Sequence, residues 1–197
     1  MNTFFLILIT LIAFISTNLD DLFVLMAFFT KKDYLRLEVI LGQYLGMISL
    51  ILISSLAYFF QLIIPNNWIG FLGIIPIIIG VKNLLNIHVK SKSDTIFVES
   101  TAKDNKVRFK FLQVGLVTFA NGGDNIGVYA PLFAGINYME ITQVILIFML
   151  MTGLWCIISI KLVDNQIIGE KIMKYGHLIL PLVLIGIGII IILRGVL

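Results

Sequence analysis

The stretch from Phe4 to Phe29, FFLILITLIAFISTNLDDLFVLMAFF, carries only two charged residues, Asp20 and Asp21. A transmembrane helix needs about 20 consecutive, mostly apolar residues, so this stretch is long enough to cross a bilayer. No basic residue precedes it, and it is longer than the apolar core of a signal peptide, which has about 7–15 residues. We therefore expect a retained transmembrane helix at the start of the chain.

Five further apolar stretches follow the first one. Their predicted bounds are Val39–Ile64, Trp68–Ile87, Phe111–Ile136, Ile141–Ile160 and Tyr175–Leu193. Their apolar residues form continuous runs and do not alternate with polar ones, which favours helices over the strands of a barrel. The sequence thus predicts an all-α membrane protein with six transmembrane helices.

The composition agrees with this fold class. Hydrophobic residues make up 59% and charged residues 13% of the 197 residues, whereas soluble proteins have about 45–50% and about 25%. These values argue against a water-soluble enzyme. They also indicate that lipid covers much of the surface, so the bilayer is the first expected partner.

The basic residues predict the orientation of the chain. Of the 14 Lys and Arg residues, all except Arg194 fall in or beside the loops that follow the first, third and fifth stretches. By the positive-inside rule this face is cytoplasmic, so both termini should lie outside the cytoplasm. The net charge of +3 is explained in this way without a nucleic-acid partner.

The two halves of the chain share a polar motif. Asn18 and Asp21 in the first stretch recur as Asn121 and Asp124 in the fourth. We expect a first three-helix repeat over 1–87, a cytoplasmic loop over 88–110 and a second three-helix repeat over 111–197. Because each repeat has an odd number of spans, the second one enters the membrane in the opposite sense. Such inverted repeats are typical of alternating-access transporters.

The recurring motif carries the chemistry. A carboxylate in the middle of a bilayer costs about 2.5 kcal/mol or more, so an intramembrane aspartate indicates a functional site. Residues three apart share a helix face, so each motif presents a carboxylate beside an amide. The predicted metal ligands are Asp21, Asp124, Asn18, Asn121, Asp20 and Asn125.

Other residues are expected to line or gate the pathway: Thr17, Gln43, Tyr44, Gly122, Gly123 and Pro131. The two glycines weaken the fourth helix and Pro131 should interrupt it, which would expose backbone carbonyls to the site. Gly42 and Gly46, four residues apart, predict close packing of the second helix.

An anionic, oxygen-rich cavity favours a cation. Two carboxylates would neutralise a divalent ion, and they must be deprotonated to bind it, so protons are the natural counter-ion of an antiporter. The metal would be the transported substrate, and no cofactor is expected. The phosphate-binding pattern G-x-x-x-x-G-K-[ST] is absent, so the driving force for transport should come from an ion gradient or from a partner protein.

Four segments carry a resemblance over nearly the whole chain. They are STNLDDLFVL (16–25), GQYLG (42–46), LGIIPIIIG (72–80) and ANGGDNIGVYAP (120–131). Together they resemble the bacterial cadmium-resistance transporter family of the lysine-exporter superfamily. The resemblance implies an inner-membrane exporter of divalent metal, Cd²⁺ above all, with Asp21 and Asp124 in the two motifs; Zn²⁺ and Mn²⁺ are further candidates. Oxygen ligands also suit Mg²⁺ or Ca²⁺.

Three other functions remain open from the residues. An exporter of amino acids or other small organic solutes would need a larger cavity with contacts for carboxylate and amine. An intramembrane aspartyl protease also needs two aspartates on different spans, but the Gly-x-Gly-Asp and Tyr-Asp patterns of such enzymes are missing. A structural membrane subunit is the third alternative. The sequence leaves homo-oligomerisation open.

Overall fold

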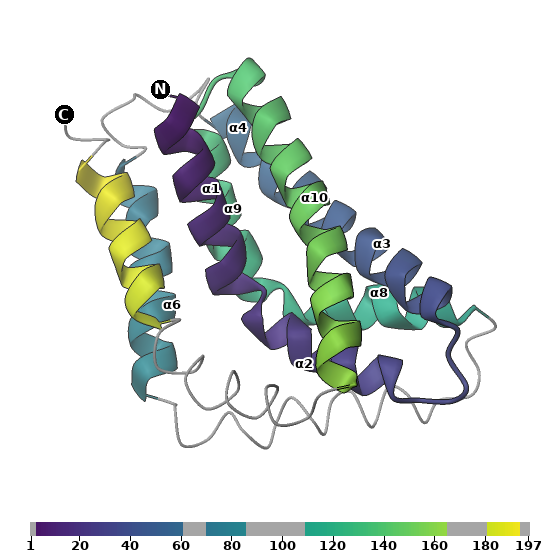
Figure 1. Ribbon diagram of the computed structural model, residues 1–197. Helices are drawn as coiled ribbons and strands as arrows, with labels where there is room; N and C mark the ends of the chain where they lie inside the picture. Colours follow the sequence, from purple (N-terminus) through teal and green to yellow (C-terminus); the bar gives the residue numbers. More distant parts are fainter. Residues whose placement is uncertain (1–2, 61–69, 86–108, 165–180, 194–197) are drawn as a thin grey trace.

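A computed structural model describes residues 3–60, 70–85, 109–164 and 181–193 of the chain (Figure 1). The described residues form helices and no strand. In chain order the helices are α1 (Thr3–Thr17), α2 (Leu19–Phe29), α3 (Arg36–Ser55), α4 (Ala57–Phe60), the 3-10 turn η1 (Gly70–Gly73), α6 (Ile74–Leu85), α8 (Lys110–Asn121), α9 (Gly123–Ala134), α10 (Tyr138–Val163) and the helix Pro181–Leu193.

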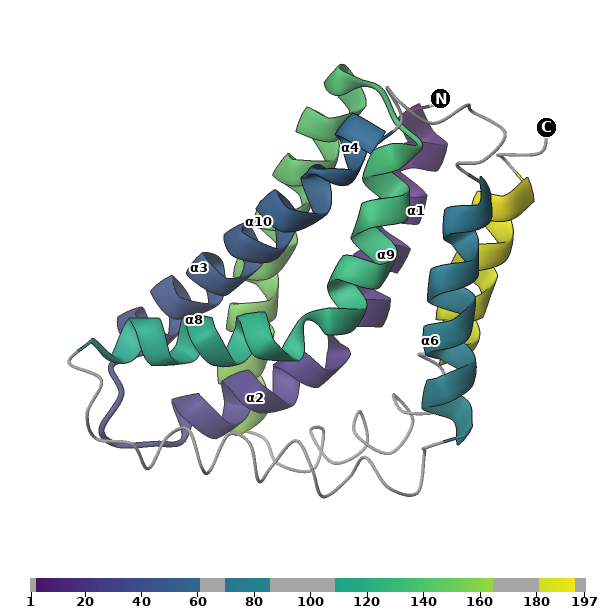
Figure 2. The same ribbon diagram turned by 180° about the vertical axis from the view of Figure 1, so that it is seen from behind.

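Two of the predicted transmembrane helices are broken. The first is divided into α1 and α2, which are bent by 53°. The predicted helix Phe111–Ile136 is divided into α8 and α9, which meet at Gly122. Both breaks lie near the middle of the molecule (Figure 2). The backbone leaves helical geometry at Asn18 (φ −110°, ψ 12°) and at Gly122 (φ −78°, ψ 24°). The helix predicted over Phe4–Phe29 is therefore broken at Asn18.

Pro131 does not interrupt the helix, contrary to expectation. It lies inside α9, which continues to Ala134. The interruption instead falls at Gly122, where glycine weakens a helix.

The number of membrane crossings follows only in part from the described helices. By length and composition, Arg36–Phe59 and Tyr138–Val163 can each cross a membrane, and the bent pair α1–α2 can be a third span. Gly70–Leu85 and Pro181–Leu193 are apolar but shorter. The structure thus agrees with an all-helical membrane protein, and the count of six spans stays a prediction.

The most extensive contact between described helices joins α3 to α8. A Cβ atom added at Gly42 would lie 2.5 Å from the carbonyl oxygen of Phe111, and one at Gly46 would lie 2.5 Å from Cβ of Thr118. Only glycine permits this approach, so the predicted close packing is confirmed. The crossing brings α3 against the first half of the broken pair α8–α9.

Aromatic side chains fill the space between α1, α9 and α10. The ring of Phe14 meets Trp155 edge-on with centroids 5.4 Å apart, and Phe148 lies 4.3 Å from Tyr129 by the same measure. All four side chains are buried. This core fixes the two breaks relative to α10.

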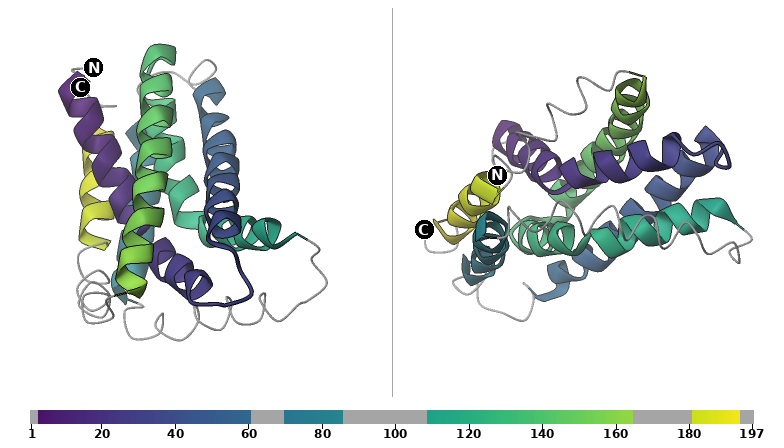
Figure 3. Two further views of the ribbon diagram at one scale, coloured as in Figure 1. Left: turned by 45° about the vertical axis from the view of Figure 1, so that its right-hand side comes forward. Right: turned by 90° about the horizontal axis from the view of Figure 1, so that it is seen from below.

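The helices α6 and Pro181–Leu193 form a separate pair on one side of the bundle (Figure 3). They run antiparallel with their backbones close together, because Gly73 faces Gly188 and Gly80 faces Pro181. The pair contacts the remainder through α6 and α9, where Ile79 covers Gly127.

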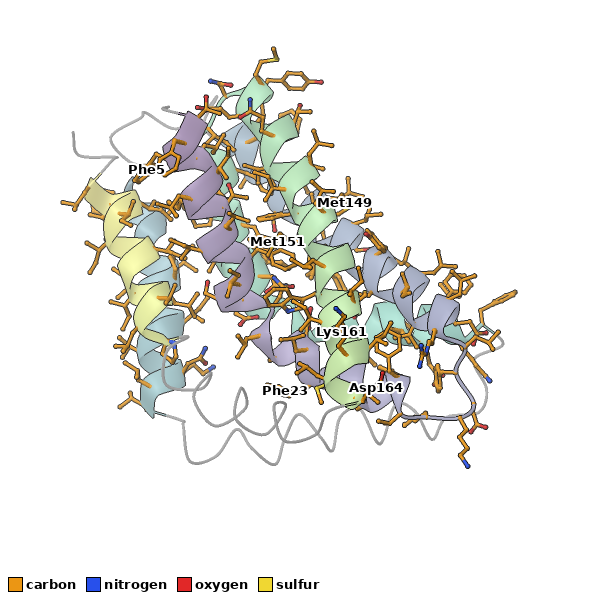
Figure 4. All side chains as sticks on the ribbon, in the orientation of Figure 1. Phe5, Phe23, Met149, Met151, Lys161 and Asp164 are labelled. Atoms are coloured by element: carbon orange, nitrogen blue, oxygen red, sulfur yellow. The ribbon has the colours of Figure 1, made fainter. Side chains whose placement is uncertain are left out.

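The polar ends of the helices gather on one side of the molecule. The end of α2, the start of α3 and the end of α10, with Lys161 and Asp164, lie at one end of the bundle (Figure 4). The start of α1 lies at the opposite end (Figure 1). The side of the membrane that each end faces stays a prediction. The predicted loop over 88–110 lies outside the described residues, apart from Phe109 and Lys110.

Candidate functional site

The carboxylate of Asp21 lies at the centre of the two broken helices. Asp21 belongs to the first turn of α2, and its side chain is 1% exposed. Its Oδ1 accepts a hydrogen bond from Nδ2 of Asn121 in α8 at 2.8 Å, and its Oδ2 accepts one from Nε2 of Gln43 in α3 at 3.1 Å. Asp21 therefore connects the first half of the chain directly to the second.

Thr118 holds Gln43 in place. The hydroxyl of Thr118 donates to Oε1 of Gln43 at 2.6 Å, and both side chains are buried. With its oxygen engaged by Thr118, the amide of Gln43 turns its nitrogen toward Asp21. The α3–α8 crossing thus supplies both amide donors of the Asp21 carboxylate.

Asn18 occupies the first break and is fully buried. Its Nδ2 donates to the hydroxyl of Tyr129 at 2.6 Å and to the carbonyl of Phe14 at 2.8 Å. Its Oδ1 accepts from Nδ2 of Asn125 at 3.3 Å, and its backbone carbonyl accepts from the indole N–H of Trp155 at 2.6 Å. Asn18 is a second polar link between the two halves.

Asp20 and Asp124 have matching positions. Each is the second residue of the helix after a break, and each is half-buried. In both cases Oδ1 accepts from the backbone N–H of the next residue at 3.1 Å. A carboxylate in the first turn of a helix interacts favourably with the helix dipole, so both aspartates stabilise their helix starts.

The starts of α2 and α9 pair residues of the two halves differently from the sequence motif. The motif alignment pairs Asp21 with Asp124, whereas the helix starts pair Asp20 with Asp124 and Asp21 with Asn125. The burial agrees with the second pairing, because Asp21 and Asn125 are each 1% exposed.

The expected pathway residues fall in different places. Thr17 is buried, and its hydroxyl donates to Tyr129 at 3.1 Å. Tyr44 contacts α10 instead, where its hydroxyl donates to the carbonyl of Met149 at 3.1 Å. Gly122 packs under Leu50, which a Cβ atom would meet at 2.3 Å, and Gly123 has open space around it. Gln43 is thus the one of these side chains that hydrogen-bonds Asp21.

Sequence reasoning missed three polar neighbours of the site: Thr118, Tyr129 and Trp155. Thr118 orients Gln43, while Tyr129 and Trp155 both bind Asn18. In a chain this rich in apolar residues an aromatic side chain resembles core filler. The hydroxyl groups and the indole N–H of these residues could have indicated their role, because such a polar group needs a hydrogen-bond partner when it is buried.

The arrangement favours oxygen ligation. Within residues 3–60, 70–85, 109–164 and 181–193, no group of three or more His, Cys, Asp or Glu side chains is placed to hold a metal ion. The side chains that contact Asp21 are amides, and their oxygen atoms are candidate ligands together with the carboxylates. Such ligands are typical of sites for hard divalent cations.

A second polar cluster joins the connection between α2 and α3 to the start of α8. The hydroxyl of Tyr34 donates to Oε1 of Gln113 at 2.5 Å, and Nζ of Lys110 donates to the carbonyl of Asp33. Lys110 also lies 5.5 Å from the centroid of the Tyr34 ring. Burial, with smaller contributions from Asp33 and Glu38, raises the pKa of Tyr34, so its hydroxyl remains a donor.

Trp155→Phe tests the link to the first break. Phenylalanine keeps an aromatic ring against Phe14 but removes the N–H that binds the Asn18 carbonyl. We expect the unfolding free energy to fall by about 1 kcal/mol, the usual net contribution of one hydrogen bond. Chemical denaturation of the detergent-purified protein measures this change. A variant as stable as the parent would show that this bond does not hold the break.

Comparisons with known proteins identify relatives at the family level. A family model described as "Cadmium resistance transporter" matches residues 14–196. The match includes α2, α3, α8, α9 and α10, and with them every residue described above as part of the site. Searches of curated proteins and of solved structures gave no match.

Proposed function

The chain belongs to the cadmium resistance transporter family, and from this we propose that it is a secondary transporter that exports divalent metal cations across the cytoplasmic membrane. Cd²⁺ is the first substrate, and Zn²⁺ and Mn²⁺ are further candidates. Family membership supports a role in transport. The metal is its cargo, so the proposal includes no cofactor.

The observation that carries the proposal is the buried carboxylate of Asp21 between two broken helices. It is 1% exposed and has only amide donors from Asn121 and Gln43 as hydrogen-bonding partners among the described side chains. A buried carboxylate without a cationic partner is costly, and such groups in membrane proteins mark ion pathways. A divalent cation would supply the missing positive charge.

The proposed ligands come from both halves. Asp21, Asn18, Asn121 and Asn125 are joined by hydrogen bonds across the two breaks. Asp20 and Asp124 lie next to them at the starts of α2 and α9. Discontinuous helices of this kind also present backbone carbonyls to cations in secondary transporters. The cation is thus proposed to sit where the halves meet.

Transport is proposed to occur by alternating access in exchange for protons. The broken pairs α1–α2 and α8–α9 are each followed by a long helix, α3 and α10, which supports an inverted repeat. Metal ligands must be deprotonated to bind, so protons can occupy the carboxylates on the return step. The multi-pass orientation with both termini outside the cytoplasm is part of the same proposal.

Asp124→Asn is the first test. Everted membrane vesicles containing the protein should accumulate Cd²⁺ when their interior is acidic, and the metal panel should include Zn²⁺ and Mn²⁺. The substitution removes one of the three proposed carboxylates, so we expect the initial uptake rate to fall about tenfold, which corresponds to about 1.4 kcal/mol. Asp164→Asn, at the end of α10, is the control and should transport normally. Uptake by Asp124→Asn at the parental rate would remove this residue from the site, and uptake that ignores the pH gradient would exclude proton exchange.

A further inference from the structure

The residues that follow the two breaks correspond one by one. Leu19 begins α2 and Gly123 begins α9, so Asp20 corresponds to Asp124 and Asp21 to Asn125. The first of these pairs makes the same bond in both halves, from the carboxylate to the next backbone N–H at 3.1 Å. The second pair is equally buried, at 1% exposure for each side chain.

The contacts across the breaks are also reciprocal. Asp21 after the first break accepts from Asn121 before the second. Asn125 after the second break donates to Asn18 at the first. Each half therefore places one buried side chain against the break of the other half. One of the two is a carboxylate and the other is an amide.

Asn125 has an oxygen atom that nothing in the described structure satisfies. Its Nδ2 is bonded to Asn18, but its Oδ1 is buried and has no hydrogen-bond donor. Among the described buried side chains, only Ser54 has another such atom, its hydroxyl oxygen. A buried carbonyl oxygen without a donor is unfavourable, and a cation is a group that would satisfy it.

We propose that Asn125 is the counterpart of Asp21 in the second half and ligates the transported cation through Oδ1. The inference rests on the proposed function and specifies its site: the innermost ligands are one carboxylate and one neutral amide, supplied by equivalent positions. Because the positions are equivalent, the site requires one carboxylate at this depth but not from a particular half. Asp20 and Asp124 supply the flanking negative charge.

Asn125→Leu tests the ligand role. Leucine keeps a side chain of similar size and removes the oxygen, so the Cd²⁺ dissociation constant, measured by calorimetry on the detergent-purified protein, should rise at least tenfold. The melting temperature of the metal-free protein should stay near the parental value, because the unsatisfied Oδ1 of Asn125 is removed while the Oδ1 of Asn18 loses its long hydrogen bond, so the number of unsatisfied buried oxygens is unchanged. Ser54→Ala is the matched control, since it also removes an unsatisfied buried oxygen. It should keep parental Cd²⁺ affinity. Parental affinity in Asn125→Leu would overturn the ligand role.

Exchange of the two side chains tests their equivalence. Asp21→Asn should lose Cd²⁺ uptake into everted vesicles, and Asp21→Asn combined with Asn125→Asp should recover at least tenfold over the single variant. Recovery is not expected from a purely structural asparagine. A double variant that is present in the membrane at parental amounts but takes up no more Cd²⁺ than Asp21→Asn would contradict the equivalence. If the double variant protein does not accumulate in the membrane, the Cd²⁺ affinity of Asn125→Leu decides whether Asn125 is a ligand.

The results separate this inference from the proposed function. If the parent protein takes up no Cd²⁺, Zn²⁺ or Mn²⁺ into vesicles, the proposed function fails, and if Asp21→Asn transports Cd²⁺ at the parental rate, the site beside Asp21 fails. If Asp21→Asn is inactive while Asn125→Leu binds Cd²⁺ as the parent does, the transporter proposal stands and only the role of Asn125 is lost.

Discussion

Cells that produce Asp21→Asn are expected to be as sensitive to Cd²⁺ as cells without the protein. Asparagine has nearly the same shape as aspartate, so the contacts with Asn121 and Gln43 can be kept or reversed. The negative charge, however, is lost from the most buried carboxylate of the site. We expect Cd²⁺ uptake into vesicles to fall at least about 100-fold, which corresponds to about 2.8 kcal/mol.

The control for this variant is Asp33→Asn. Asp33 carries an exposed carboxylate in the short connection between α2 and α3, where only its backbone carbonyl is engaged by Lys110. This variant should protect cells as well as the parent does. Growth on a Cd²⁺ gradient compares the two, with immunoblots of membranes to match protein amounts. Equal protection by Asp21→Asn and Asp33→Asn at equal amounts would rule out Asp21 as the cation ligand.

Gly46→Val should have the largest effect on stability. The added Cβ would lie 2.5 Å from Cβ of Thr118 and 2.9 Å from the carbonyl oxygen of Gly115, so α3 and α8 would have to separate. Overpacking of a core commonly costs about 1–3 kcal/mol. Because Thr118 orients Gln43, the separation should also disturb the donors of Asp21 and lower Cd²⁺ uptake.

The matched substitution is Gly123→Ala, because a Cβ atom at Gly123 meets nothing within 4 Å. Thermal unfolding in detergent should show a clearly lower midpoint for Gly46→Val and a parental midpoint for Gly123→Ala. If both variants unfold at the same midpoint temperature as the parent, the close α3–α8 crossing does not exist in the folded protein.

The helical class and the close packing of α3 could be predicted because their causes are local. Long apolar runs need no tertiary information to indicate membrane helices, and Gly42 and Gly46 are readable as a packing motif. The break at Asn18 was not predictable in this way. No glycine or proline stands between Thr17 and Leu22, and the bend depends on partners far along the chain, above all Tyr129 and Trp155.

The candidate site shows the same division. The sequence pointed to Asp21, Asn18 and Asn121 because a carboxylate and an amide recur in apolar surroundings. In the structure one hydrogen bond joins Asn121 directly to Asp21. The proposed pairing of Asp21 with Asn125 required the positions at which α2 and α9 begin. A motif with only two identical residues cannot distinguish this pairing from one shifted by one residue. The orientation of Gln43 by Thr118 required the packed α3–α8 crossing.

The central claim is that a divalent cation binds beside Asp21, between the two broken helices. Anomalous X-ray diffraction from crystals of the Cd²⁺-loaded protein locates the metal directly. The account predicts a peak within ligand distance of Asp21 that also contacts an oxygen from the second half, with Asn125 first among them, and the loss of that peak in Asp21→Asn crystals. A peak held by other residues, or one that persists without the Asp21 carboxylate, would contradict it.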